Sequence, residues 1–366
     1  MTTDWNNETV TIQSISKPTG VPNLVKAGLW YDRNRNLLYL GFAGRASYIN
    51  NETNAIPTPW PPGVWQFKPD GDVSGPFNTT IASTDALWDF MTRPCSGLIS
   101  YGAGKGYVLA GASSPDPRDD QVPAIGGMIV FDYTTETIFN NTITGSHFEG
   151  GIHMGGMLYL PNYGAEGIFI VIGGEDQNLH LLPMNVSSIY DPSTGKWYQQ
   201  PLTGDVPNPR KAHCISGAYS MNGTFEMLVL SPFLHGVFIY SSQCASFLYG
   251  GWSGRATSAN MPFDEIHILT LPAFVWYKVQ YPPLNPRHTV TCQSVGGGQI
   301  LTIGGLDSDN TEPDPDVYLN VFDSHDPFAQ GLNVFDLSTL WWKDQYTANP
   351  GPYVASKTIM DIYAKG

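Results

Sequence analysis

The sequence predicts an all-β fold in which short sheets surround a common axis as a β-propeller. Aliphatic strands end in paired glycines at intervals along the chain, at Gly173-Gly174, Gly250-Gly251 and Gly304-Gly305. Each pair is followed by a strand that an aromatic residue closes, at Trp197, Trp276 and Trp341. A repeat of roughly fifty residues made of strands and turns indicates a radial array, because one such sheet cannot bury both of its faces.

Five such units follow one another, over about residues 26–86, 87–144, 145–205, 206–282 and 283–349. Within each unit, apolar or alternating stretches of about four to seven residues lie between turn residues, as strands do. Apolar-rich segments are left over at the two ends, at 9–15 and 354–364. A ring needs its last blade tied to its first. We therefore expect about six blades, five complete and one incomplete blade shared by the termini, in a single domain over residues 1–366.

Composition fits a well-filled fold and excludes several classes of partner. The chain of 366 residues has 39 Gly and 29 Pro, which suit many tight turns. Its formal charge of −14 disfavours nucleic acid and anionic membranes. No stretch reaches the roughly eighteen apolar residues of a membrane helix, and the polar start shows no secretory signal. Membrane attachment would thus need a segment that this chain lacks, and we expect a monomer.

Residues 227–245 break the repeat pattern. The turn at 221–226 corresponds to 295–298 in the next unit, yet about twenty more residues precede the glycine-ended strand at Phe247. These residues are strongly apolar and carry no charge. They represent either an extra hairpin or loop, or an insertion foreign to the repeat, such as translated intron sequence, because a long exposed apolar loop promotes aggregation.

Basic residues near the first strands of three units are the candidate binding site, at Arg93, Arg210, His213, Arg287 and His288. Innermost strands surround the central channel, so these side chains could gather at one mouth and bind a carboxylate or an acidic sugar through bidentate contacts. The alternative is that each arginine joins its own blade to the next. No metal or cofactor is expected, since the histidines show no ligand spacing such as His-x-His.

Potential modification sites indicate whether the protein is secreted or stays inside the cell. Asn-x-Ser/Thr sequences, which accept N-linked glycans in secreted proteins, occur at Asn7, Asn51, Asn78, Asn140, Asn185 and Asn222. Cys214 and Cys292 occupy similar places in adjoining units. They would form a disulfide in a secreted protein, and two buried thiols are the alternative.

The glycine pairs, the segment from Tyr190 to Trp197 and the segment from Phe335 to Trp342 resemble kelch repeats, and the chain is similar to fungal cell-surface kelch proteins in particular. The resemblance covers about residues 27–343. It implies a kelch-type propeller, like that of galactose oxidase, whose copper ligands match no motif here. Members of the fungal group usually carry a signal peptide, a complete first blade and a membrane helix after the propeller, and this chain shows none of them.

The resemblance implies a non-enzymatic binding module, the extracellular part of a surface or secreted protein, which recognises a protein or glycan through its loops. The longest loops, 45–62, 113–125 and 307–330, contain aromatic residues suited to anchor a partner, namely Tyr48, Trp60 and Tyr318. Two alternatives stay open. One is a carbohydrate-active lyase or hydrolase at the channel mouth, with a histidine or carboxylate as acid or base. The other is an intracellular kelch scaffold in the cytoplasm.

Overall fold

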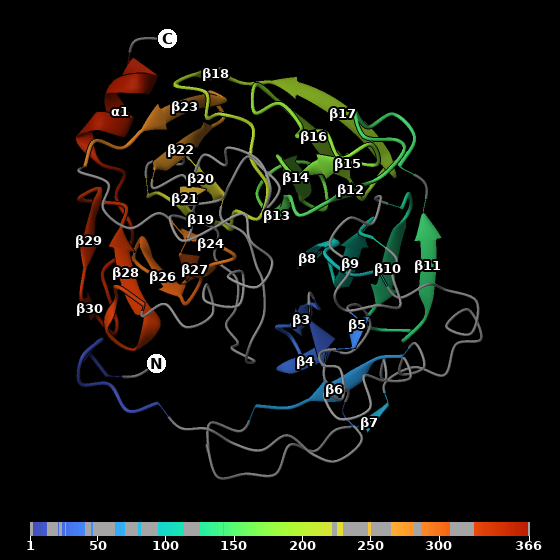
Figure 1. Cartoon of the computed structure of the whole chain (residues 1–366), viewed down its shortest axis with the longest axis horizontal. Helices are drawn as coiled ribbons and strands as arrows, with labels where there is room; N and C mark the ends of the chain where they lie inside the picture. The colour runs from blue at the N-terminus through green and yellow to red at the C-terminus, as the bar shows by residue number, and fades with distance from the viewer. Residues whose placement is uncertain are drawn as a thin grey trace, which may run out of the picture.

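A computed structural model gives the architecture of the chain (Figure 1). It describes residues 3–12, 21, 24–25, 27–40, 45–46, 63–69, 80–81, 94–112, 125–141, 143–221, 225–229, 248–249, 265–281, 287–307 and 326–364. Five antiparallel sheets surround a central axis, which confirms the all-β propeller and its five complete blades. In each sheet the first strand lies nearest the axis (Figure 1).

The first two blades contain the strands β3 (Leu29–Asp32), β4 (Leu37–Leu40), β6 (Trp65–Phe67) and β7 (Thr80–Ile81), then β8 (Leu98–Gly102), β9 (Lys105–Leu109), β10 (Met128–Asp132) and β11 (Ile138–Asn141). The third contains β13 (Gly156–Leu160), β14 (Ile168–Ile172), β16 (Val186–Asp191) and β17 (Lys196–Pro201). The fourth contains β19 (Ile215–Tyr219), β20 (Phe225–Val229), β22 (Ile266–Leu271) and β23 (Val275–Lys278), and the fifth β25 (Thr291–Ser294), β26 (Gln299–Ile303), β28 (Leu332–Asp336) and β29 (Trp341–Lys343).

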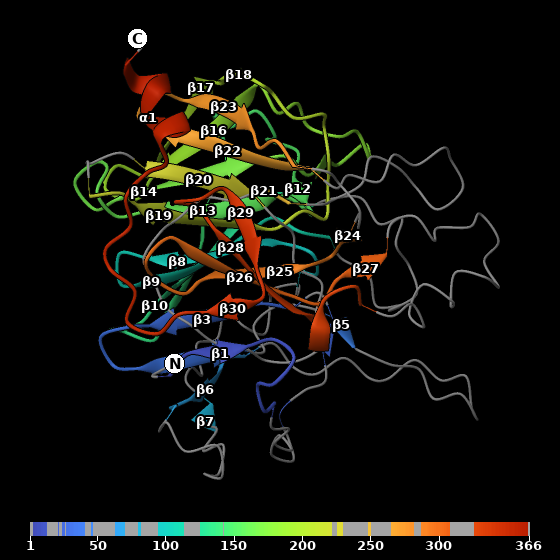
Figure 2. The same ribbon diagram turned by 90° about the vertical axis from the view of Figure 1, so that its left-hand side faces the viewer.

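Shorter strands extend this frame. Three two-stranded ribbons continue past the ends of the blade strands: β2 (Leu24–Val25) with β5 (Arg45–Ala46), β12 (Ile152–His153) with β15 (Glu175–Asp176), and β24 (Arg287–His288) with β27 (Leu306–Asp307). In the side view, β5, β24 and β27 lie on the same side of the sheets (Figure 2). The fourth sheet also includes β18 (Thr203–Gly204) and β21 (Leu248–Tyr249), and a 3-10 turn η3 (Ala329–Gly331) precedes β28.

Aromatic rings fill the space between neighbouring blades. Trp30 of the first blade stacks on Phe131 of the second, with ring centroids 5.7 Å apart, and its indole N–H donates to the carbonyl of Tyr107 at 3.0 Å. Tyr107 in turn packs on Phe169 of the third blade at 4.4 Å. All four side chains are buried. Each blade therefore forms one wall of the core of the next, which is why a single repeat cannot fold alone.

The Asp-containing motifs form the hairpins between the third and fourth strands. Asp191 Oδ1 accepts the backbone N–H of Ser193 at 2.9 Å and its hydroxyl at 2.6 Å, and Gly195 completes the turn with a φ of 69°. Asp132 and Asp336 accept backbone N–H groups two residues further on in the same way. Asp side chains favour such turns because they replace a backbone acceptor locally.

The aromatic residue that closes the fifth blade is Trp342, whereas the sequence pattern predicts Trp341. Trp342 pairs with Phe335, in the register in which Trp197 pairs with Tyr190, and its ring centroid lies 5.4 Å from that of Phe335. Trp341 is 53% exposed. Successive side chains of a strand point to opposite faces, so a shift of one residue decides which tryptophan packs.

The two ends of the chain lie on different blades. β1 (Trp5–Asn6) pairs with β30 (Gln345–Tyr346) just after the fifth blade, and the Trp5 and Tyr346 rings stack at 5.5 Å. Helix α1 (Lys357–Ala364) packs on the fourth blade, where the Tyr363 hydroxyl donates to the carbonyl of Leu271 at 2.8 Å. Within the described ranges the two ends thus share a two-stranded sheet, β1 with β30, whereas residues 9–12 form no strand and 357–364 form a helix.

The strand register of the fourth blade measures the break in the repeat. Met227 of β20 pairs with Leu269 of β22, and Leu248 of β21 pairs with His267 of the same strand. In one continuous antiparallel strand the paired residue numbers have a constant sum, but here the sums are 496 and 515. The difference is 19 residues, the length of the segment 227–245. Because 227–229 belong to β20, the surplus begins slightly later than the sequence pattern predicts, and 230–245 lie outside the described residues.

Candidate functional site

The first hairpin of every blade borders a cavity on the propeller axis. Its volume is about 610 Å³. The walls come from the turns after the innermost strands, at 31–34, 101–104, 159–162, 218–219 and 294–298, and from Pro352 and Tyr353 near the C-terminus. Tyr133, which follows β10 of the second blade, also borders it. The cavity is therefore a product of the ring, because all five blades contribute to its wall.

Tyrosine recurs at the same place in four of the five blades. The innermost strands β3, β8, β13 and β19 carry it near their ends, at Tyr31, Tyr101, Tyr159 and Tyr219, and all four side chains are half-buried. In the fifth blade the last two pairs of this hairpin hold Gln293 and Ser294, and Val295 and Gly296 to Gly298 follow in the turn. Tyr353 packs there instead, and a Cβ on Gly298 would lie only 2.4 Å from its Cδ2.

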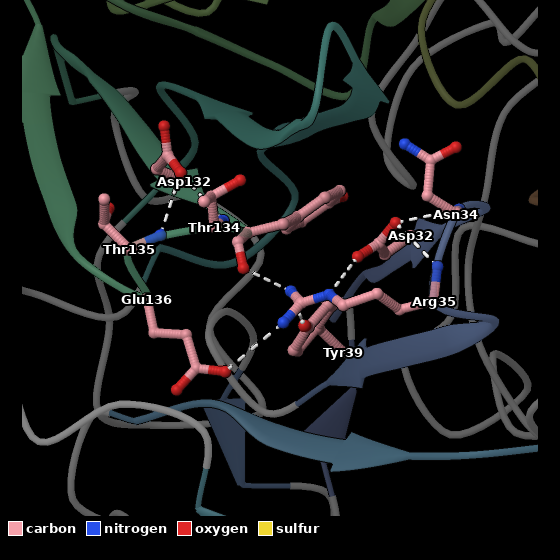
Figure 3. Close-up of polar contacts among 9 residues, drawn as sticks. Asp32, Asn34, Arg35, Tyr39, Asp132, Thr134, Thr135 and Glu136 are labelled. Atoms are coloured by element: carbon pink, nitrogen blue, oxygen red, sulfur yellow. Dashed lines mark hydrogen bonds and ion pairs between the residues drawn. The ribbon is translucent and has the colours of Figure 1, made fainter.

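Arg35 links the first blade to the second next to Asp32, Arg33 and Asn34, which border the cavity (Figure 3). Its Nε lies 2.5 Å from Asp32 Oδ2, and its Nη2 donates to the Tyr39 hydroxyl at 2.6 Å and to the backbone carbonyl of Tyr133. Its Nη1 is 3.7 Å from Glu136 Oε1. Burial raises the pKa of Tyr39 to about 12, so this phenol stays protonated. The network holds the first hairpin against the second blade.

Backbone hydrogen bonds close the opposite end of the axis. Met154 N–H donates to the carbonyl of Ser96 at 3.0 Å, Ala212 N–H to Met154 at 2.9 Å, and Thr289 N–H to Ala212 at 3.0 Å. These four residues precede the innermost strands of successive blades, and each has a left-handed φ between 54° and 57°. A non-glycine residue in this conformation costs about 1–3 kcal/mol, which the surrounding structure must offset.

The glycine pair Gly173-Gly174 serves the same closure, and Gly250-Gly251 lies outside the described residues. Gly174 N–H donates to the carbonyl of Arg210 in the next blade at 3.0 Å. A Cβ on Gly174 would lie 2.8 Å from Gly155 Cα, and one on Gly173 would lie 2.5 Å from the ring of His213. Glycine is therefore required because backbone and a histidine ring of neighbouring segments occupy the side-chain positions.

No protein-family model matches the chain. A curated protein of Arthroderma benhamiae, described as a kelch repeat-containing protein, is 27% identical over 202 residues, which cover 54% of this chain and 25% of that protein. The chain thus spans about a quarter of the length of this relative. The similarity and the five four-stranded blades agree on one architecture. The chain is a kelch-repeat propeller.

Two of the three arginines expected at a channel mouth are buried inside the kelch propeller. Arg210 is fully buried, and its Nη2 lies 3.3 Å from Glu265 Oε2 while its Nε donates to the carbonyl of Asn208. Arg287, also buried, donates to the carbonyl of Gly305 at 2.8 Å and lies 3.4 Å from Asp326. Through these contacts each of the two guanidiniums ties together segments of its own blade.

The predicted binding site also included His213, His288 and Arg93. His213 is fully buried, and burial, with the neighbouring charge of Arg210, lowers its pKa to about 3, so it is neutral. His288 is part of β24, and Arg93 lies outside the described residues. In the described part of the chain, no group of three or more His, Cys, Asp or Glu side chains could hold a metal ion.

A buried charged cluster that the sequence pattern did not indicate links two blades of the kelch propeller. Lys211 of the fourth blade pairs with Glu175 of the third, and His153 Nε2 lies 3.2 Å from Glu175 Oε1. Burial acts to raise the pKa of Glu175, but His153 and Lys211 outweigh it and lower that pKa. Glu175 is therefore ionised and satisfied within the fold.

The sequence left open whether Cys214 and Cys292 form a disulfide or remain two thiols. In the structure they form a disulfide with a Cα–Cα distance of 6.1 Å, between the fourth and fifth blades. Cys95 is buried and free.

The glycosylation sequences differ in accessibility. Asn140 and Asn185 are exposed. Asn7 is buried and its amide N–H donates to the carbonyl of Leu332 at 2.9 Å, so this residue cannot accept a glycan in the folded propeller. Asn51, Asn78 and Asn222 lie outside the described residues, as do Tyr48, Trp60 and Tyr318 of the predicted recognition loops.

The tyrosines of the cavity were missed as site residues. A signal existed, because in four units a tyrosine stands in one of the last two residue pairs of the first hairpin, at Tyr31, Tyr101, Tyr159 and Tyr219. Tyr353 has no such signal, since it belongs to the segment after the last repeat.

Proposed function

We propose that this kelch propeller is a non-enzymatic binding module whose protein or glycan ligand enters the axial cavity. The cavity itself carries the proposal. Its volume of about 610 Å³ lies inside the range of about 300–1,000 Å³ that is typical of small-ligand sites. Its wall is rich in aromatic rings mounted on rigid strands, the arrangement that binds a ligand with little loss of conformational entropy.

The lining favours binding over catalysis. Among the described residues that border the cavity, Asp32 is the sole carboxylate, and none is a histidine. Asp32 already accepts the backbone N–H groups of Asn34 and Arg35 and pairs with the Arg35 guanidinium. An acid–base mechanism at this mouth needs a free carboxylate or histidine within reach of the substrate, and this lining supplies neither.

An array experiment with the complete chain tests the proposal. Arrays of glycans and of secreted proteins would be probed with the labelled protein and with the variant Tyr219→Ala. We expect binding of at least one ligand that this variant weakens at least tenfold while its unfolding midpoint in urea stays close to that of the parent. Binding that is equally strong in the variant would move the site away from the cavity and overturn the proposal.

The proposed setting is outside the cell, on a fungal surface protein or in secreted form. Support comes from the Cys214–Cys292 disulfide, since disulfides persist in oxidising compartments, and from the exposed Asn140 and Asn185. No helix in the described ranges is long and apolar enough to cross a membrane. Peptide mass analysis of protein from its native source should find glycan on Asn140 or Asn185 and no free thiol on Cys214. Unmodified asparagines with two reduced cysteines would favour the intracellular scaffold.

A further inference from the structure

The tyrosines of the axial cavity present ring faces of fixed orientation. The Tyr31 hydroxyl donates to Asn36 Oδ1 at 3.0 Å, the Tyr159 hydroxyl donates to the carbonyl of Glu166 at 2.7 Å, and the Tyr219 hydroxyl accepts the N–H of Asn162 at 3.0 Å. Asn36 and Glu166 lie in the hairpin turns that follow β3 and β13, whereas Asn162 lies in the turn after β13 and links the third blade to Tyr219 of the fourth. The rings are therefore anchored at their polar ends, and residues held in this way lose little conformational entropy when a ligand binds.

The lining of the cavity is mostly uncharged. Asp32 and Arg33 are the charged side chains among the described residues that border it, and Asp32 is already paired with Arg35. The remaining polar groups are uncharged and come from Asn34, Asn162, Ser294 and the tyrosine hydroxyls. A cationic ligand would find no free carboxylate there, and an anionic ligand would find one cation, Arg33, whose side chain is exposed to solvent. A neutral ligand needs no charged partner.

One buried group in the wall lacks a partner. Tyr133 is 4% exposed and borders the cavity, and its hydroxyl makes no hydrogen bond to any described residue. Burial raises its pKa well above the usual value, so the group is a phenol able to donate and accept. A buried hydroxyl without a partner costs about 1–3 kcal/mol. The oxygen itself has less than 1 Å² of accessible surface, so a ligand hydroxyl would reach it, and remove that penalty, when the side chains around it move aside.

We propose that the cavity binds a neutral sugar, a pyranose unit or the end of a neutral glycan chain, with its C–H face on the tyrosine rings and its hydroxyls on Tyr133 and the asparagine amides. This inference rests on the proposed function and narrows its ligand to one chemical class. Aromatic faces match the apolar side of the sugar ring, and uncharged amides and hydroxyls match its rim. Tyr31 and Tyr101, whose rings meet edge to face at 6.3 Å, form one corner of the site.

The test uses the complete chain and defined probes in saturation-transfer NMR and titration calorimetry. The neutral probes are cellobiose, maltose, a mannobiose and diacetylchitobiose, and the comparison probes are digalacturonic acid and a proline-rich peptide. We expect at least one neutral disaccharide to bind. Tyr31→Ala should weaken that binding at least tenfold, whereas Tyr31→Phe should stay within about threefold because the ring face is retained. Tyr133→Phe removes a hydroxyl alone and should weaken binding about five- to tenfold.

The matched control is Tyr198→Ala on the outermost strand β17, where the side chain is 49% exposed and far from the axis in chain topology. It should leave sugar binding unchanged. Urea unfolding of every variant separates lost binding from lost folding. If the acidic sugar or the peptide binds in a Tyr31-dependent way and no neutral probe does, the sugar inference fails while the binding module stands. If no probe or array ligand depends on Tyr31 or Tyr219, both fail.

Discussion

The two ends of the propeller axis differ in what fills them. At one end, backbone hydrogen bonds link Ser96, Met154, Ala212 and Thr289 from blade to blade, and Arg210 and His213 are buried beside them. At the other end, the first hairpins leave a cavity of about 610 Å³ with half-buried tyrosines. The comparison teaches that the motifs most visible in the repeat, the glycine pairs and Pro-Arg segments, hold the ring together. The side chains that are candidates for ligand binding lie at the other end, where the sequence repeat is less regular.

The largest expected effect is on stability at the closed end. Arg210→Ala should lower the free energy of unfolding by about 3 kcal/mol, because it removes a buried hydrogen-bonded charge and leaves Glu265 with Lys278 as its remaining partner. Arg33→Ala, at the rim of the open end, should change it by less than about 0.5 kcal/mol, since that side chain is exposed. Urea unfolding of both variants decides. Equal losses would remove the distinction between the two ends.

A pH effect of intermediate size should also come from the closed end. The pKa of His213 is about 3 in the fold, below the ordinary 6.5 of an unfolded chain. Its stabilisation is therefore complete above pH 6.5 and is lost as pH falls toward 3. Between pH 7 and pH 5 the free energy of unfolding should fall by about 2 kcal/mol on account of this residue.

The control is the same pH series on His213→Gln. The quantity compared is the slope of the free energy of unfolding against pH in the parent and in the variant. His267, whose pKa burial lowers to about 2, adds a similar dependence that both proteins share. A parent and a variant with identical slopes between pH 7 and pH 5 would show that the pKa of His213 is the same in the fold as in the unfolded chain, contrary to its burial.

The smallest effect concerns the strand that runs between the two ends in the fourth blade. Deleting residues 229–247 removes the surplus of 19 and lets Leu228 continue directly into Leu248 in the register of β22. We expect a folded propeller whose free energy of unfolding is unchanged or higher by up to about 1 kcal/mol, because a long loop no longer has to be closed. Urea unfolding of the deletion variant against the parent measures this.

A deletion one residue shorter, 229–246, is the control. It adds one residue to the strand and forces a bulge or a register slip that turns side chains to the wrong face. It should therefore be clearly less stable than the in-register deletion. If both deletions unfold the protein, the segment belongs to the fold and is not foreign to it.

The sequence by itself determined the fold class, because a repeat of glycine-ended and aromatic-closed strands can bury its faces only against neighbouring copies. It also placed five units and indicated a surplus of about twenty residues in the fourth, whereas the register of β20 and β21 on β22 measured that surplus as 19 residues. Tertiary structure alone decided which of Trp341 and Trp342 packs, as the two differ by one residue along a strand whose faces alternate. It also decided the fates of Arg210 and Arg287, whose partners Glu265 and Asp326 lie far along the chain. Above all it made the cavity, because five hairpins and Tyr353 come together only when the ring is assembled.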